Sequence, residues 1–167
     1  MTTLCCSLNG ELQFAAPGDP ILEKVSTPLS IEELKAPAMQ RFFDAMFTLA
    51  RGEQIDQYKS VLVGLAAPQV GQPVRVILVD ILADGKGSVS DLRLYINPEI
   101  LELSEDTEEW YEGCYSTGDI RGIVARPNYV KIKALDRDGN EIIEYHSGYI
   151  ARIFQHEIDH LNGIRFP

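Results

Sequence analysis

The sequence predicts a single α+β domain. Two segments with apolar residues at helical spacing lie towards opposite ends of the chain, at residues 37–51 and 147–162, and segments rich in β-forming residues lie between them. The chain has 167 residues, of which 45% are hydrophobic, and this is enough for one sizeable core. We expect residues 1–16 to form an N-terminal leader and residues 17–167 to form one domain.

The expected elements follow from periodicity and stop signals. Apolar residues recur at helical spacing over residues 37–51, and Gly52 follows as a stop. The last helix is expected over residues 147–162, with Ser147 as N-cap and Gly163 just beyond its end. Four strands are expected between the helices, at residues 74–80, 92–96, 130–135 and 141–145, the last two joined by a hairpin turn at Asp138-Gly139.

Charge and composition restrict the partners and the compartment. The chain has 15 basic and 25 acidic side chains, hence a net charge of −10, so we expect no binding to nucleic acid or to an anionic membrane. No apolar run reaches the roughly 20 residues of a membrane span, and the N-terminus does not resemble a secretory signal. Three cysteines, Cys5, Cys6 and Cys114, are an odd count that favours reduced thiols. We therefore expect a cytoplasmic protein whose partners are proteins, peptides, small molecules or metal cations.

The strongest chemical signal is His156-Glu157-Ile158-Asp159-His160, an H-E-x-x-H pattern on the expected last helix. Side chains four residues apart lie one turn apart on the same helix face, so both imidazoles can reach one metal ion. Glu157 is displaced round the helix from both, which suits a general base acting on metal-bound water. Nearly opposite the histidines is an apolar stripe of Ile150, Phe154, Ile158 and Leu161. The alternative is an ordinary amphipathic helix with two chance histidines.

A catalytic metal site normally needs a third protein ligand. The downstream position that supplies it in some H-E-x-x-H proteins is Phe166 here, and the chain ends at Pro167, so the ligand must come from upstream. The candidates are Cys114, His146 and several carboxylates. The alternatives are that Cys114 is a small buried hydrophobe and that His146 is an exposed or capping side chain.

Three segments together resemble the peptide deformylase family, which carries G-x-G-x-A-A-x-Q, E-G-C-x-S and H-E-x-D-H in this order. They correspond here to Leu62-Val63-Gly64-Leu65-Ala66-Ala67-Pro68-Gln69, to Glu112–Ser116 and to His156–His160. The resemblance extends from about residue 17 to the end and is to a short form that stops just after the last motif. It implies mixed or antiparallel β-sheets around a central C-terminal helix that carries H-E-x-x-H, with an N-terminal helix.

The resemblance also implies the activity and the ligands. Cys114, His156 and His160 would bind one divalent metal ion per chain, usually Fe(II) in this family, with Zn, Ni or Co as other occupants. The enzyme would be a monomeric hydrolase that removes the N-formyl group from the formylmethionine of newly made polypeptides. Metal-bound hydroxide would attack the formyl carbon, with Glu157 as general base and then general acid.

Further roles are implied around this centre. The Gln69 side chain and the backbone N–H of Tyr115 would stabilise the oxyanion, and Gly64 would let the substrate backbone dock. Paired with Glu112 or Asp159, the side chains of Arg121 and Arg126 would brace the ligands, with solvated pairs as the alternative.

The sequence departs from the family pattern at two positions beside the expected substrate site. Leu62 replaces the first glycine of the first motif, and Tyr115 replaces the more usual leucine beside the substrate.

Two other functions remain as alternatives. One is a hydrolase of another acyl group, and the other is a non-catalytic metal-binding or interaction protein. The presence of Glu157 and Gln69 argues against the non-catalytic protein, because a structural metal site needs neither residue. Such a site also normally has a fourth protein ligand.

Overall fold

A computed structural model describes residues 11–54, 61–84, 91–118 and 120–165. Cys5, Cys6 and Phe166 lie outside these residues. The helices are α1 (Ile31–Lys35), α2 (Pro37–Ala50) and α3 (Gly148–Leu161), and the short 3-10 helices are η1 (Pro20–Glu23), η2 (Ala67–Val70) and η3 (Tyr115–Thr117). The strands are β1 (Gly64–Ala66), β2 (Val76–Asp80), β3 (Leu92–Leu103), β4 (Thr107–Gly113), β5 (Arg121–Pro127), β6 (Tyr129–Leu135) and β7 (Glu141–Ser147).

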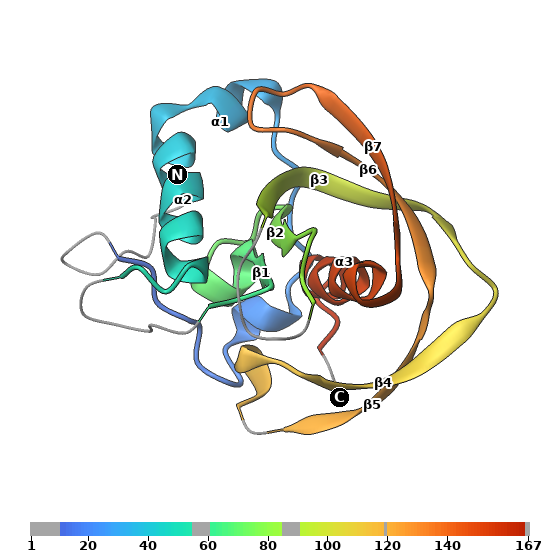
Figure 1. Ribbon diagram of the computed structural model, residues 1–167. Helices are drawn as coiled ribbons and strands as arrows, with labels where there is room; N and C mark the ends of the chain where they lie inside the picture. Colours follow the sequence, from blue (N-terminus) through green and yellow to red (C-terminus); the bar gives the residue numbers. More distant parts are fainter. Residues whose placement is uncertain (1–10, 55–60, 85–90, 119, 166–167) are drawn as a thin grey trace.

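The strands form two antiparallel sheets around α3. One sheet has five strands in the order β1-β2-β3-β6-β7, and the other is the pair β4-β5. Figure 1 shows α3 enclosed by these strands, with α2 on the other side of β1 and β2. This arrangement confirms the expected α+β fold, in which antiparallel sheets surround the C-terminal helix and a helix precedes them.

Two apolar clusters stabilise this arrangement. One lies between α2 and the five-stranded sheet and includes Phe42, Phe43 and Met46. The other lies between the same sheet and α3 and includes Phe154 and Ile158 of the predicted stripe. The sheet is therefore covered on both faces, and α3 is held by its apolar side while its polar sides face elsewhere.

The two predicted helices are confirmed to within one or two residues at each end. Ser147 occupies the N-cap position of α3, as expected, although its side chain makes no capping hydrogen bond. Gly163 follows the helix with a φ of +70°, as expected for a residue that ends a helix.

The strand predictions missed part of the sheet structure. β3 continues past the expected end at residue 96 to Leu103, because Asn97 adopts a φ of +51° and two register shifts let the strand bend and go on. Three strands were missed, β1, β4 and β5. Most side chains of β4 are exposed, so the sequence has no clear apolar alternation there.

Part of the expected leader packs on the domain. The Leu12 side chain is buried, and its backbone N–H donates to Gln54 Oε1 over 3.0 Å. None of the described helices is both long enough and apolar enough to cross a membrane.

Candidate metal centre

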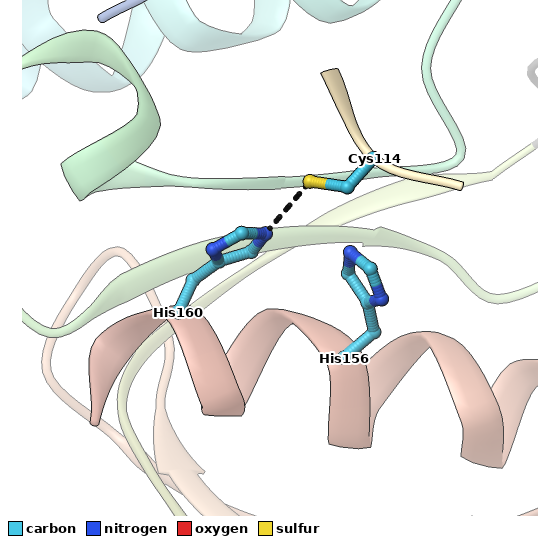
Figure 2. A group of neighbouring side chains, drawn as sticks. All are labelled: Cys114, His156 and His160. Carbon is cyan, nitrogen blue, oxygen red and sulfur yellow. Dashed lines mark hydrogen bonds between the residues drawn. The ribbon is translucent and has the colours of Figure 1, made fainter. Parts of the chain in front are cut away.

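The helical spacing of α3 and the end of β4 bring three metal-binding side chains together. His156 and His160 lie one turn apart on α3, and Cys114 follows the last residue of β4. Their possible ligand atoms all lie within 4.8 Å of one another, and Cys114 Sγ is 3.1 Å from His160 Nε2 (Figure 2). His146 is not in this group; its ring stacks on Phe154 and its Nε2 lies 3.0 Å from Glu144 Oε2.

The chemistry of this group fits a divalent metal ion. One sulfur and two imidazole nitrogens are ligands for Zn(II) or Fe(II), and three protein ligands leave a fourth position for water or substrate. Burial opposes ionisation of the Cys114 thiol, but the imidazoles of His156 and His160 outweigh it and lower the pKa of the thiol to about 5. Burial likewise opposes protonation of His156, yet Cys114 and Glu112 raise its pKa, so metal binding would displace protons.

Glu112 contacts the metal-binding His156 at the ring nitrogen that faces away from Cys114. Its Oε2 lies 3.1 Å from Nδ1 of His156, which leaves Nε2 of that ring directed at the metal group. Arg126 donates to both carboxylate oxygens of Glu112, over 2.7 and 3.1 Å, and Arg152 donates to Oε1 over 2.6 Å. Burial would raise the pKa of Glu112, but His156 and the two guanidinium groups lower it to about 2. Glu112 is therefore ionised and can orient the imidazole.

The arginines only partly follow the sequence prediction. Arg126 bridges Glu112 and Asp159, with 2.8 Å between its Nη1 and Asp159 Oδ2, as expected. Arg121 instead lies over Gly113, and no ion pair joins it to either carboxylate in the described structure. Arg152 was not predicted, although its position one turn before His156 was a usable signal.

Glu157 lies deep in the site. Its side chain is 5% exposed, and its Oε2 has no hydrogen-bond partner among the described residues. Burial raises its pKa to about 7. Gly64 of β1 lies against this carboxylate, because a β-carbon added there would fall 2.9 Å from Glu157 Cδ. Only a residue without a side chain fits between β1 and Glu157 without a shift.

The amide of Gln69 is held in one orientation. Its Oε1 accepts a hydrogen bond from Ala66 N over 2.8 Å. Its Nε2 donates to Ser116 Oγ over 3.2 Å and lies 3.5 Å from Cys114 Sγ. The NH₂ group therefore points towards the metal-binding group.

A cavity of about 290 Å³ opens beside these groups, and its wall includes Gly64, Gln69, Cys114, His156 and Glu157. Residues 61–64 form one side of this cavity and residues 111–113 form another, so it lies between the edges of the two sheets.

The two departures from the family pattern lie at this cavity. Leu62 is buried in the core, donates its N–H to Ala50 O, and has no positive φ. A glycine is therefore not needed at this position. Tyr115 is 46% exposed, and its ring stacks on Phe14 with 5.5 Å between centroids.

A thiolate and two imidazoles beside a buried helical carboxylate, at an open cavity, define a metal-dependent hydrolase. Residues 12–167 match the model of the polypeptide deformylase family. Peptide deformylases of Carboxydothermus hydrogenoformans and Treponema pallidum are both 40% identical to the chain. The first alignment covers 89% of this chain and 86% of the relative, and the second covers 93% and 85%. The chain belongs to the polypeptide deformylase family.

Solved structures agree with this membership. A Met-Ala-Ser-bound class I type b peptide deformylase from Acinetobacter baumannii has a TM-score of 0.80 at 37% identity, over 93% of this chain and 96% of that one. The peptide deformylase of Thermotoga maritima has a TM-score of 0.70 at 35% identity, over 92% and 93%.

Proposed function

We propose that this protein removes the formyl group from N-formylmethionyl peptides, with Cys114, His156 and His160 holding one divalent metal ion. The observation that carries the proposal is the buried Glu157 carboxylate, with one oxygen unpartnered in the described structure, at the same cavity as the three metal-binding side chains. A bound metal ion would lower the pKa of a coordinated water and polarise the formyl oxygen.

Glu157 would move the proton. Hydrolysis takes a proton from the attacking water and returns one to the amine that leaves, so a single carboxyl group can serve both steps. In the metal-free protein, burial raises the pKa of Glu157 to about 7, so this carboxyl group can exchange a proton near neutral pH. The products are formate and a peptide with a free N-terminal methionine.

Two donors would stabilise the oxyanion. The NH₂ group of Gln69 is held near Cys114 Sγ by the bonds to Ala66 and Ser116, so it needs no reorientation during the reaction. We assign the second donor to the backbone N–H of Tyr115, because this residue directly follows Cys114.

The substrate would bind as an extended chain between the edges of β1 and β4. Each is an edge strand of its own sheet, and each contributes residues to the cavity, so an added peptide can hydrogen-bond to both. The missing side chain of Gly64 leaves space for the formyl end beside Glu157. The apolar side chains of Leu62, Val63 and Ile153 line the same cavity and suit a methionine.

We propose Fe(II) as the native ion, because the family usually holds it and the donor set suits it; Zn, Ni or Co would also bind. We further propose that the enzyme acts in the cytoplasm, where nascent chains are made, and as a monomer.

Release of formate from formyl-Met-Ala-Ser and of acetate from acetyl-Met-Ala-Ser, by protein loaded with Ni(II), tests this function. We expect hydrolysis of the formyl peptide only, and its loss in Glu157→Ala with the metal content unchanged. Preferred cleavage of the acetyl peptide would assign another acyl group. The absence of formate from folded, fully metallated protein would exclude deformylation.

A further inference from the structure

Cys114 is at the far end of a two-stranded arm. β4 and β5 pair only with each other among the described strands, and they join the five-stranded sheet through β3 and β6 at the Thr107 and Pro127 end. Seven residues of extended chain span roughly 20 Å, so the end of the arm lies far from this attachment. Contacts along the arm must therefore determine where the thiol lies relative to the two histidines on α3.

Arg152 provides the densest of these contacts. From α3 it donates to Val124 O of β5 over 2.9 Å, to Glu108 O of β4 over 2.5 Å and to Glu112 Oε1 over 2.6 Å. One buried guanidinium thus connects the helix with both strands of the arm and with the carboxylate that orients His156. The planar guanidinium, with five donors in a fixed geometry, can satisfy all three acceptors at once.

Arg126 does not duplicate this function. It is part of β5, so its two bonds to Glu112 of β4 lie within the arm. Its link to the helix is the ion pair with Asp159, whose side chain is 32% exposed. Of the two described arginines that contact Glu112, only Arg152 comes from α3.

We propose that Arg152 is a positioning residue of the metal centre, which holds the β4–β5 arm on α3 so that the Cys114 thiolate stays within ligand distance of His156 and His160. The proposal rests on the proposed function only in that these three side chains bind the metal. It is independent of which acyl group is cleaved.

The test uses Co(II)-loaded full-length protein, because the thiolate-to-Co(II) absorption band reports on the Cys114 ligand without turnover. In Arg152→Met we expect this band to weaken and Co(II) affinity, measured by chelator competition, to fall about 10–100-fold, as for other partners of metal ligands. Arg152→Lys keeps the charge but not the three-way donation, so its affinity should fall between those of wild type and Arg152→Met.

A matched control is Arg137→Met. Arg137 also links two elements, through part-buried hydrogen bonds to Gln40 and an exposed ion pair with Asp44. It ties the β6–β7 turn to α2, away from the metal centre. We expect this variant to lose stability and to keep wild-type Co(II) affinity.

The proposal is overturned if Arg152→Met keeps the wild-type band and an affinity within twofold, or if Arg137→Met weakens Co(II) binding equally. If Arg152→Met does not fold, a wild-type Co(II) affinity in Arg152→Lys would overturn the proposal instead. Wild-type protein that binds Co(II) but releases no formate from the formyl peptide would refute the proposed function alone.

Discussion

Replacement of Gly64 by alanine tests whether β1 positions the proposed base. The added β-carbon would lie 2.8 Å from Ile153 Cγ2 and 2.9 Å from Glu157 Cδ. Carbon atoms normally approach to about 3.5–4.0 Å, so these side chains would have to move by roughly 0.7 Å or more. The glutamate has the freer end, and it can turn towards the cavity.

This displacement should affect activity more than stability. A shift of about 1 Å in a reacting group can cost on the order of 10²-fold in rate, so we expect kcat to fall about 10–100-fold. Overpacking typically costs about 1–3 kcal/mol, and the open cavity favours the lower end of that range for Gly64→Ala. Formate release by Ni(II)-loaded protein gives kcat and KM, and urea unfolding gives the free energy of unfolding.

Gly18→Ala is the control for a change in stability alone. Gly18 has a φ of +92°, and an added β-carbon would meet no atom within 4 Å. We expect a loss of about 1 kcal/mol from backbone strain, with kcat unchanged. A kcat within twofold of wild type in Gly64→Ala would refute the inference that β1 leaves no room for a side chain beside Glu157.

Three other predictions concern stability. Glu112→Gln should destabilise metal-free protein by about 3 kcal/mol at pH 7, because the folded pKa of Glu112 is about 2 against an ordinary 4.5. Because its pKa is lower in the folded state, ionised Glu112 stabilises the folded protein above pH 4.5. This stabilisation is lost as the pH falls from 4.5 towards 2. The difference from wild type in urea unfolding should therefore shrink in that window, whereas a pH-independent difference would contradict it; exposed Glu109→Gln is the control. Gly163→Ala should cost about 2–4 kcal/mol, because φ is +70° and the β-carbon would lie 2.8 Å from backbone carbon of Glu23. Gly139→Ala, with a φ of +90° but only the end of the Ile31 side chain nearby at 3.2 Å, should cost about 1 kcal/mol, and equal losses would argue against the close backbone contact. Finally, chelation should lower the Tm. Relative to protein at a free metal concentration 1,000 times Kd, the free energy of unfolding should fall by up to about 4 kcal/mol. An unchanged Tm after verified metal removal would argue against a bound ion that favours the folded state.

The part of the site on α3 could be predicted from the sequence. A helix places residues at fixed angles and rises, so the spacing of His156 and His160 is enough to put both imidazoles on one face. The same rule predicts that the apolar stripe lies on another face, and this is how α3 packs on the five-stranded sheet.

The partners of this helix could not be predicted in the same way. Spacing alone left Cys114, His146 and the carboxylates as candidates for the third ligand. The missing ligand of the two-histidine motif favoured Cys114, and the family resemblance added to this. The mostly exposed residues of β4 give no strand signal, so the arm that carries Cys114 was missed.

The sequence by itself determined the fold class, the two long helices and the pair of histidines around Glu157, because each depends on periodicity between near neighbours. Only the tertiary structure decided that Cys114 meets these histidines, that Glu112 lies behind His156, and that Arg152 joins helix and arm. Those contacts join residues 28 to 46 positions apart, and they depend on strand pairing and packing that no local pattern encodes.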